Sequence, residues 1–544
     1  MKNTVILLAL SLSINAVFAS IPKHVVFTYM GNPSTSITVN WQTILQGDLA
    51  MPVKEAIVYY DTNSRPAVAD EYTQYVNART FQIEGLPNRY IHRGQLQGLK
   101  PDKTYYIRVR SSSGTLSKEF KVHTIPNDDS PISFVTGGDM GTSEETRLLL
   151  EHAASYSPNF AAIGGDIAYA NGQLKSIGNW DKWLDYYSNE MVTPDGYSIP
   201  AVLSIGNHEV RGGYAKSKTE APFYFNFFGQ DDAQSYFARK FGANLVLFSL
   251  DSGHIASHQS QVDWLRQELE LNKNIRYRAA LYHVPLYPSH RDPMGQYSAE
   301  GRKHWAPVFD AFALTVAFEN HDHTYKRTHL LKAGEATGDG SGTLYLGDGC
   351  WGRNARGTDY DPRPYLHASG SIQHFWYVEM DTNSAVYRAI DIENQVFDVY
   401  PSEHPEAEVA RAVFEEKINR YIIPQGVVTM SSLGDISADW LGGRSEIRIE
   451  NTFETAIDAK ISARYPADRF MVTGILSDEL HLRSGSVHTL GLSIAPIGDT
   501  PIDFEQLRIR VDIELFRPAS EHQPAASFNK TLLVPYSIKN YANE

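Results

Sequence analysis

Hydrophobic and polar residues alternate in short runs over the first part of the chain. The segment "SITVNWQT" sets Ile37, Val39 and Trp41 against polar neighbours, and "YYIRVR" repeats the pattern. Alternation with a period of two is typical of strands with one buried face, and glycine and proline separate the runs. Residues 20–126 are therefore predicted to form a β-sandwich.

The pattern changes from Ile132 onward. Apolar runs such as "ISFVTGGD" and "FAAIGGD" are separated by stretches with helical periodicity, of which "TSEETRLLLEHAASY" is the first. In that stretch Thr142 and Glu145 have the spacing of a capping box, which predicts a helix start. Buried strands that alternate with helices indicate an α/β layered domain, here predicted over residues 127–402.

Beyond this domain the chain returns to strand patterns. A helical segment, "HPEAEVARAVFEEKINRYI", is predicted to connect the two parts over residues 403–426. In "LRIRVDIEL" one face carries only aliphatic residues and the other carries charges. Residues 427–544 are therefore predicted to form a second β-sandwich. It holds no cluster of catalytic residue types, so the sequence leaves its role open.

The first residues have the composition of an export signal. "MKNTVILLALSLSINAVFAS" combines Lys2, a short apolar stretch and small residues at a cleavage position, which predicts a signal peptide over residues 1–19. The later sequence has no apolar run of about 18 residues, so no membrane span is expected after cleavage. Cys350 is the sole cysteine, which excludes an internal disulfide and predicts a small buried side chain. We expect a secreted or periplasmic protein of bacterial type.

The net charge of −14 narrows the range of partners. Such a charge opposes binding to nucleic acid or to anionic lipid, because phosphates would be repelled. It leaves room for a small anionic substrate, since bound cations can reverse the sign of the charge inside one cleft.

Polar side chains of particular types follow the predicted strands of the central domain. Any one of them has a purely structural explanation, such as a helix cap, a turn or a satisfied buried histidine. Together they predict one site, because ligands bind at the carboxyl ends of strands in open α/β sheets. The residues are Asp139, Asp166, Tyr169, Asn207, His208, His283, His321 and His323.

The donor types favour particular metals. Carboxylates, a phenol, an amide and imidazoles offer oxygen and nitrogen without thiolate, which suits iron, zinc or manganese. One carboxylate, such as that of Asp166, can bridge two ions. Two ions can hold the attacking and leaving oxygens of a displacement at phosphorus and lower the pKa of bound water.

The blocks that carry these residues resemble a known family. Asp139, "GDIAY", "GNHE", "ALYH" and "NHDH" resemble, in order, the five blocks of the purple acid phosphatases, which are calcineurin-like metallophosphoesterases. "LKPDKTYYIRV" resembles a loop and strand of fibronectin type III modules, where a tyrosine braces the corner. The resemblance covers most of residues 21–400. It implies a multidomain chain with a fibronectin III-like β-sandwich, a central α/β four-layer β-sandwich and the C-terminal β-sandwich.

The resemblance also implies two metal sites. In the family pattern a ferric ion is held by Asp139, Asp166, Tyr169 and His323. A second ion, Zn(II), Mn(II) or Fe(II), is held by Asp166, Asn207, His283 and His321. Substrate-binding roles fall on Asn207, His208 and His290. Catalytic roles fall on His208, on Glu209 as the residue that orients it, and on His290.

The sequence departs from the family pattern at two places. Asn320 stands where the last block begins with glycine, and asparagine is one of the few other residues that tolerate a positive φ. Ala280 stands where the fourth block begins with valine. "GDGCWG" (residues 347–352) fits the letters of a dinucleotide motif, but no helix pattern follows it, so a glycine-rich loop near the cleft is the prediction. The aromatic segment "TEAPFYFNFFGQ" (residues 219–230) is expected either to wall the cleft or to pack beneath a loop.

These observations predict an exported binuclear acid phosphatase that acts on small phosphorylated substrates. It would hydrolyse phosphomonoesters by attack of metal-bound hydroxide, with His208 assisting the leaving group. One alternative is a phosphodiesterase or nucleotide hydrolase that uses the same metals. Another is a catalytically silent surface or periplasmic binding protein. The oligomeric state is left open.

Overall fold

The computed structural model describes residues 22–45, 55–65, 71–111, 116–357, 363–421, 427–436, 440–467, 469–474, 479–498, 509–518 and 526–538. The predicted signal peptide, residues 1–19, lies outside the described residues. Within the described ranges no helix is both long enough and apolar enough to cross a membrane.

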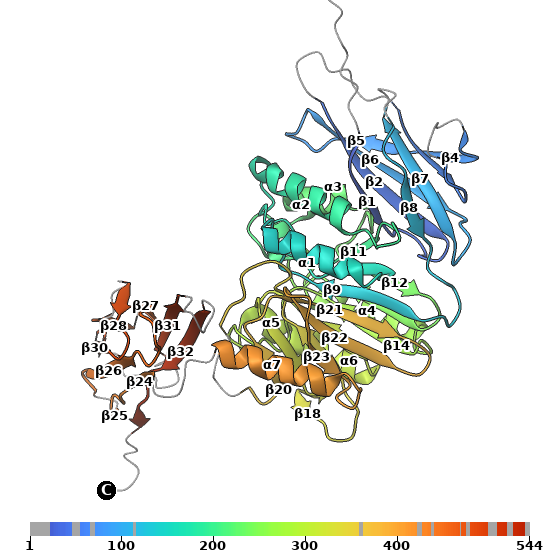
Figure 1. Cartoon of the computed structure of the whole chain (residues 1–544). Helices are drawn as coiled ribbons and strands as arrows, with labels where there is room; N and C mark the ends of the chain where they lie inside the picture. The colour runs from blue at the N-terminus through green and yellow to red at the C-terminus, as the bar shows by residue number, and fades with distance from the viewer. Residues whose placement is uncertain are drawn as a thin grey trace, which may run out of the picture.

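The N-terminal part forms two antiparallel four-stranded sheets (Figure 1). The first has the order β1 (Lys23–Thr28), β2 (Ser36–Ile44), β6 (Arg89–Gln97) and β5 (Arg79–Phe81). The second has the order β4 (Gln74–Asn77), β3 (Ala56–Asp61), β7 (Thr104–Ser111) and β8 (Phe120–His123). At the start of β7 the Tyr105 hydroxyl accepts a hydrogen bond from the Lys100 amide at 2.9 Å. A tyrosine therefore braces this corner, as the motif predicts.

The central part contains two larger sheets. The six-stranded sheet has the order β11 (Ala201–Leu203), β10 (Phe160–Ile163), β9 (Ile132–Gly137), β21 (His374–Met380), β22 (Ala385–Asp391) and β23 (Val396–Tyr400). The seven-stranded sheet has the order β12 (Phe237–Phe241), β13 (Leu245–Ser249), β14 (Tyr277–Leu281), β15 (Val316–Phe318), β19 (Leu344–Gly347), β16 (Tyr325–Thr328) and β20 (Leu366–Gly370). A short hairpin, β17 (Leu331–Lys332) and β18 (Glu335–Ala336), lies beside the second sheet.

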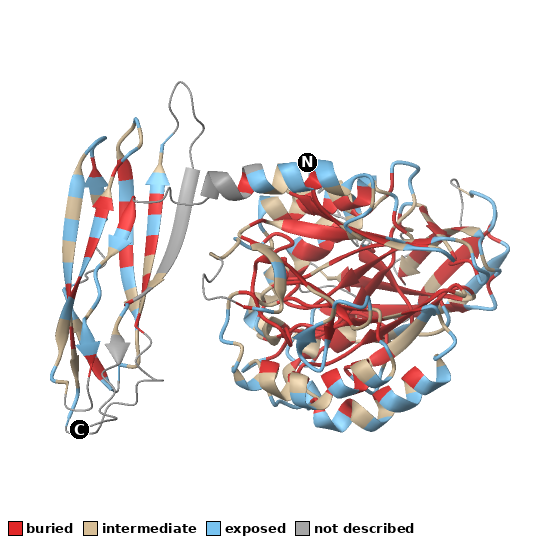
Figure 2. Ribbon diagram, turned by 90° about the horizontal axis from the view of Figure 1, so that it is seen from below, coloured by how far each residue is buried: buried red, intermediate tan, exposed pale blue. Residues whose placement is uncertain are grey.

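The two sheets share one core, and helices cover their outer faces. Phe134 and Phe160 of one sheet pack in the same buried cluster as Leu281 and Phe318 of the other, and Figure 2 shows this interior as continuous buried ribbon. Two helices pack on the six-stranded sheet: α1 (Glu144–Ser155) and α2 (Ile177–Glu190). Three lie on the side of the seven-stranded sheet: α4 (Val262–Leu271), α5 (Gln296–His304) and α6 (Ala306–Ala311). The layered arrangement predicted for this part is confirmed.

The start of α1 differs from the prediction. The N-cap is Ser143, whose backbone is extended and whose hydroxyl accepts from the Thr146 amide at 3.4 Å. The helix begins at Glu144, so Glu145 lies in the first turn and Thr142 precedes the cap. Thr142 and Ser143 are both suitable N-cap residues by sequence, and the backbone conformation shows that Ser143 is the cap.

The aromatic segment of residues 219–230 packs internally. It contains α3 (Pro222–Phe227), and its aromatic side chains lie in the core that also holds Trp180 and Trp183 of α2. Phe223 and Phe227 lie against Trp180, with ring centroids at 6.1 and 5.7 Å. The packing alternative is therefore the one observed.

After α7 (Ala407–Tyr421) the chain forms the C-terminal sheets. One has the order β24 (Val428–Met430), β26 (Gly443–Glu450), β30 (Val487–Pro496) and β28 (Phe470–Thr473). The other has the order β29 (Leu480–Leu482), β27 (Ile457–Arg464), β31 (Arg510–Arg517) and β32 (Ala526–Leu533). β25 (Asp435–Ile436) pairs in parallel with β33 (Ser537–Ile538). The aliphatic side chains of Ile509, Val511, Ile513 and Leu515 are buried in the core of these sheets, as their alternation predicts.

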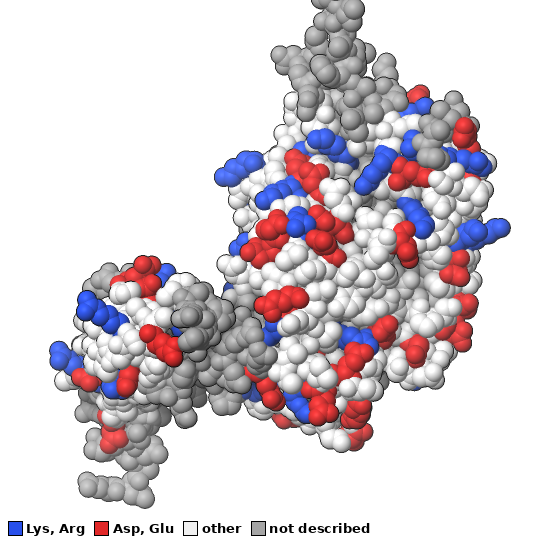
Figure 3. Space-filling model, in the orientation of Figure 1, with Lys and Arg blue, Asp and Glu red and all other residues white. Residues whose placement is uncertain are grey.

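Charged side chains of the described residues are spread over the face seen in Figure 3 and form no single patch of one sign there. Acidic side chains are interspersed there with basic ones over both the N-terminal and the central parts. The net charge of the chain therefore does not describe the charge at any one site.

Candidate metal centre

The parallel strands of the two central sheets bring the predicted residues to one edge. β9, β10 and β11 run parallel, as do β13, β14, β15 and β19. Each predicted residue follows the carboxyl end of one of these strands. Asp139 follows β9, Asp166 and Tyr169 follow β10, Asn207 follows β11, His283 follows β14, and His321 and His323 follow β15. A strand end is a rigid support, so these side chains are held in place by the sheets rather than by mobile loops.

Three of the side chains form a first cluster. The Nε2 atom of His323 lies 2.9 Å from Oδ1 of Asp139 and 3.0 Å from the hydroxyl oxygen of Tyr169. That hydroxyl lies 3.2 Å from the same Asp139 oxygen. Asp139 is fully buried and His323 nearly so. These three residues are the unshared ligands that the family pattern assigns to the ferric site.

A second cluster surrounds His283. Its Nε2 atom lies 3.1 Å from Oδ2 of Asp166, 3.0 Å from Oδ1 of Asn207 and 3.0 Å from Nδ1 of His321. Asp166, His283 and His321 offer ligand atoms that all lie within 4.8 Å of one another. With Asn207, these residues are the set that the family pattern assigns to the second ion.

The contacts of the two ring nitrogens of His283 show that a cation fits this second cluster. Its Nδ1 atom donates to the carbonyl oxygen of Gly164 at 3.0 Å, so the Nε2 atom of a neutral ring carries a lone pair. That lone pair faces a carboxylate oxygen and an amide oxygen, which are also acceptors. These acceptors repel one another unless a proton or a cation lies between them, and a metal cation is the group that would satisfy all of them.

The pKa shifts of residues in the two clusters also favour a bound cation. Burial alone lowers the pKa of His283, but the carboxylates of Asp166 and Asp139 outweigh it and raise that pKa to about 9. Burial lowers the pKa of neighbouring His321 well below its usual value, and His283 adds to the effect. Burial also raises the pKa of the Tyr169 hydroxyl well above 10, and Asp139 raises it further. The buried carboxylates therefore favour a positive charge beside His283, which a bound cation would supply.

Backbone strain is concentrated in these residues. Five of the seven predicted ligands have left-handed φ values: Asp139 (55°), Asp166 (51°), Tyr169 (56°), His321 (78°) and His323 (56°). A non-glycine residue pays about 1 kcal/mol or more for this conformation. Strain of this kind persists where the surrounding structure holds side chains in one required arrangement.

Glu209 does not have the contact that was predicted for it. Its carboxylate accepts hydrogen bonds from the backbone amides of Asp166 (2.7 Å), Ile167 (2.8 Å) and Gly206 (2.9 Å). The side chain is buried, and burial, followed by the charge of Asp166, raises its pKa to about 7. Glu209 therefore positions the loop that carries Asp166 instead of orienting the His208 ring.

Asn171 contacts His208 in its place. Its side-chain oxygen accepts a hydrogen bond from Nδ1 of His208, so Nε2 faces the site, 3.7 Å from Oδ2 of Asp166. The ring also lies against Tyr169, with centroids 4.1 Å apart. Sequence reasoning missed Asn171 because an Asn-Gly pair is typical of a turn, and its φ of 55° shows that it does lie in one.

Asn320 differs from expectation in its backbone. The left-handed residues of this turn are His321 and His323, and Asn320 is not among them. Its side-chain nitrogen donates to the carbonyl oxygen of Tyr282 at 3.0 Å. A Cβ atom on Gly138 or Gly164 would lie 2.6 or 1.8 Å from this side chain. The two Gly-Gly-Asp segments thus leave the space that Asn320 fills, so its role is packing between loops.

His290 lies at the rim of the site. Its backbone amide donates to Oδ2 of Asp322 at 2.7 Å, and its Nδ1 atom donates to the carbonyl oxygen of Gly357 at 2.7 Å. The Asp322 carboxylate also accepts a hydrogen bond from the Arg291 amide at 3.1 Å and lies 3.3 Å from the Arg291 guanidinium. Asp322, between the two histidines of "HDH", therefore holds the loop that carries His290.

Arginines and a glycine-rich loop complete the surroundings. Arg353 lies over the Tyr169 ring, 4.3 Å from its centroid. The loop of residues 347–352 passes so close to Asp139 that a Cβ on Gly349 would lie 2.0 Å from Oδ2 of Asp139. Cys350 is buried, as predicted, and its thiol lies 3.3 Å from the carbonyl oxygen of Arg353. The prediction of a glycine-rich loop beside the cleft agrees with this position.

Comparison with known proteins gives family-model matches over residues 22–325 of the chain. The family model described as "Purple acid Phosphatase, N-terminal domain" matches residues 22–124, and "Calcineurin-like phosphoesterase" matches residues 122–325. "Phosphoenolpyruvate phosphatase" of Allium cepa is 25% identical over 333 residues, which cover 57% of this chain and 63% of the relative. "Purple acid phosphatase 15" of Arabidopsis thaliana is 25% identical over 310 residues, which cover 50% of this chain and 57% of the relative. The match thus spans about three fifths of the length of these two relatives.

Solved structures support the fold. The purple acid phosphatase PPD1 from yellow lupin (Lupinus luteus) seeds aligns with a TM-score of 0.58 at 18% identity, over 70% of this chain and 74% of its own. PhoD aligns with a TM-score of 0.53 at 15% identity, over 70% of this chain and 89% of its own. Adjacent matches to both family models, the layered fold and purple acid phosphatase relatives agree, and the chain belongs to the purple acid phosphatase family of calcineurin-like phosphoesterases.

Proposed function

We propose that this protein is a binuclear metal-dependent phosphatase that hydrolyses phosphomonoesters. The observation that carries the proposal is the convergence of acceptor atoms at the carboxyl ends of β9, β10, β11, β14 and β15. The proposal is also supported by relatives named as phosphatases, among them "Fe(3+)-Zn(2+) purple acid phosphatase 12" of Arabidopsis thaliana, which is 22% identical over 57% of this chain and 66% of its own length.

The two clusters would hold different ions. Asp139, Tyr169 and His323 would bind Fe(III), because a trivalent cation lowers the pKa of a phenol so that it loses its proton to solvent and binds as phenolate. Asn207, His283 and His321 would bind Zn(II), Mn(II) or Fe(II), and Asp166 would serve both. When bound, the cations would activate water as a nucleophile and offset the charge that develops on the phosphoryl group.

The chain's own residues would bind and orient the ester. The Asn171 contact turns Nε2 of His208 toward the site, where the protonated ring would donate a hydrogen bond to the departing oxygen. Asn207 and His290 would contact the phosphate from two sides. The Asp166 carboxylate accepts from the His208 backbone amide at 2.7 Å, which ties the histidine to the metal-binding residue.

Visible absorption tests the ferric assignment. The wild-type protein is expected to be coloured, because a tyrosinate on Fe(III) absorbs visible light, and Tyr169→Phe is expected to lose this band. Tyr186→Phe, on the outer helix α2, should keep it. Iron analysis accompanies the spectra, and a colourless wild-type protein without iron would show that the ferric assignment is wrong.

Gly349→Ala is expected to damage the same cluster. At φ +85° an alanine is strained by about 1–2 kcal/mol, and its Cβ would meet Oδ2 of Asp139 at 2.0 Å. The Asp139 carboxylate would have to move, so we expect a loss of bound iron and of turnover of at least about tenfold. Metal analysis and a phosphatase assay measure both.

Gly338→Ala is the control for this substitution, because its Cβ would meet nothing within 4 Å. A Gly349→Ala protein with full metal content and full turnover would contradict the close approach seen here.

A substrate panel distinguishes the alternatives within the family. Hydrolysis of p-nitrophenyl phosphate with little activity on bis(p-nitrophenyl) phosphate supports a monoesterase. The reverse result favours a phosphodiesterase. A protein that binds both metals and cleaves neither ester, nor nucleotides, would be the silent binding protein.

We further propose that the protein is exported, to the periplasm or the medium. The support is the composition of residues 1–19. Cell fractionation with N-terminal sequencing tests it, and a cytoplasmic protein that keeps its first residues would contradict it.

A further inference from the structure

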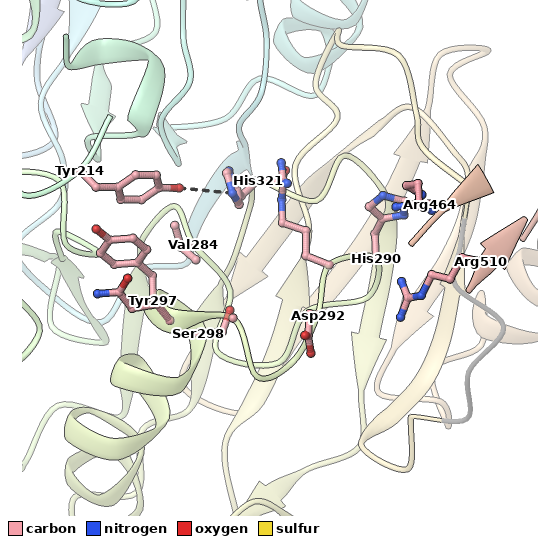
Figure 4. A pocket seen from close by; sticks show the side chains of 12 residues that line it. Tyr214, Val284, His290, Asp292, Tyr297, Ser298, His321, Arg464 and Arg510 are labelled. Atoms are coloured by element: carbon pink, nitrogen blue, oxygen red, sulfur yellow. Dashed lines mark hydrogen bonds between the residues drawn. The ribbon is translucent and has the colours of Figure 1, made fainter. Parts of the chain in front are cut away.

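A pocket of about 390 Å³ adjoins the second metal cluster, and it is lined by residues from two parts of the chain (Figure 4). This volume lies within the range of small-molecule sites. His321 forms part of its wall. On one side of His321 lie Tyr214 and Tyr297, whose rings stack at 4.1 Å. On the other side lie His290 and two arginines of the C-terminal sandwich, Arg464 and Arg510.

The two arginines are neighbours within one sheet. Arg464 is the last residue of β27 and Arg510 the first residue of β31, and they are direct partners in the antiparallel register. Like charges at directly opposed positions destabilise a sheet. Asp512 binds Arg464 through both carboxylate oxygens, one of them at 2.7 Å from Nη2. Asp512 therefore offsets part of the repulsion, and the register places two guanidinium groups at the end of the sheet that faces the pocket.

Three guanidinium groups lie in the wall of the pocket, two of them paired with nearby carboxylates. Arg291 also lines it, from the loop next to His290, and among the lining residues that the structure describes the carboxylate is that of Asp292. Asp322, behind the wall, lies 3.3 Å from the Arg291 guanidinium. Asp322 and Asp512 thus orient two of the three guanidinium groups, and a guanidinium group held in this way can still pair with a planar carboxylate or a phosphate of a ligand.

From these observations we infer that the C-terminal sandwich completes the substrate pocket, and that Arg464 and Arg510 bind a second anionic group of the substrate. This inference rests on the proposed function. The scissile phosphate would lie at the metal-binding residues, and a phosphate or carboxylate elsewhere on the leaving group would extend toward the arginines. Tyr214 and Tyr297 would contact the part between or beside the two charged groups.

Paired substrates test the inference in the full-length, metal-loaded protein. Fructose 1,6-bisphosphate is compared with fructose 6-phosphate, and 3-phosphoglycerate with glycerol 3-phosphate. The wild type is expected to prefer the substrate with the second anion in at least one pair, and that pair identifies phosphate or carboxylate. In R464Q/R510Q we expect kcat/KM for the preferred substrate to fall about tenfold, mainly through KM. The value for p-nitrophenyl phosphate should remain within about twofold of wild type.

The matched control is R448Q in the same domain. Arg448 lies on β26 in the other sheet, pairs with Glu450 at 2.7 Å and does not line the pocket. It should leave every kcat/KM value unchanged. No preference for a second anion in the wild type, or an equal loss on all substrates in R464Q/R510Q, would overturn the inference while leaving the phosphatase proposal in place.

A binding measurement separates the two proposals. If the wild type hydrolyses no ester, the phosphatase proposal fails, and calorimetry with fructose 1,6-bisphosphate against fructose 6-phosphate tests the arginines without turnover. Tighter binding of the bisphosphate that is lost in R464Q/R510Q would still support the second anion site. Equal binding of the two sugars in the wild type would overturn it.

Discussion

Asp166→Asn is expected to remove nearly all phosphatase activity while leaving the fold intact. The Oδ1 atom of Asp166 accepts the His208 amide at 2.7 Å, and Oδ2 lies 3.1 Å from Nε2 of His283. Asparagine has the same shape but lacks the charge and replaces one acceptor with a donor. A carboxylate that serves two cations cannot be replaced by a neutral amide without losing several kcal/mol of charge stabilisation. We expect kcat to fall about a thousandfold, which corresponds to about 4 kcal/mol.

Steady-state kinetics and metal analysis on the same preparations measure this effect. Asp263→Asn is the matched control, because that aspartate is exposed in the first turn of α4, away from the site. Glu209 accepts hydrogen bonds from the backbone of the Asp166 loop, so this loop is expected to keep its conformation in the variant. An Asp166→Asn protein with wild-type kcat would remove Asp166 from the mechanism.

Lys326→Met is expected to have the largest effect on stability. Lys326 is fully buried on β16, and its ammonium group contacts the carboxylates of Glu319 and Asp348, the latter at 2.7 Å, and the carbonyl oxygen of Tyr287 at 2.5 Å. Removal of one member of a buried ionic group leaves charges without a partner, which costs about 3–5 kcal/mol. Methionine fills a similar volume, so the loss would report charge rather than packing.

The same cluster supports the metal centre. The Glu319 carboxylate also accepts a hydrogen bond from the hydroxyl of Tyr282, the residue before His283, at 2.7 Å. The Asp348 carbonyl oxygen accepts a hydrogen bond from the His323 amide at 2.8 Å. Denaturant unfolding of Lys326→Met should therefore show the stability loss together with weaker metal binding.

Lys303→Met is the control for Lys326→Met, because Lys303 is 66% exposed and its pair with Glu300 spans 3.6 Å at the surface. Such pairs contribute at most about 1 kcal/mol. Equal stability losses in the two variants would show that the buried cluster is not a stabilising unit.

Several features of this protein were accessible from the sequence. The period of the hydrophobic pattern indicated two β-rich regions and a layered α/β region, because side chains return to the same face every two residues in a strand and about every 3.6 residues in a helix. The residues at the strand ends could be predicted for a related reason. An apolar run must stop where the strand leaves the core, so Asp139, Asp166, His283 and His321 each followed such a stop. Parallel strands then bring those stops to one edge.

The hydrogen-bond partners of individual side chains could not be predicted from the sequence in this way. Glu209 was expected to hold His208, but it holds backbone amides around Asp166, and Asn171 holds His208 instead. Both side chains lie within hydrogen-bonding reach of the same turn, and only the path of the backbone decides which donor each one meets. Asn320 stands in place of glycine as a residue that tolerates a positive φ, yet the left-handed residues of the turn are His321 and His323, and the Asn320 side chain fills the space beside Gly138 and Gly164.

The sequence by itself determined which residue types stand at the strand ends, and therefore the class of chemistry and the family. The tertiary structure alone decided what surrounds them. Arg464 and Arg510 are more than 130 residues from His321 in sequence and carry no motif, yet they line the same pocket. Local patterns report on burial and turn geometry, which act over a few residues, whereas the contact between two domains depends on how separately folded surfaces meet.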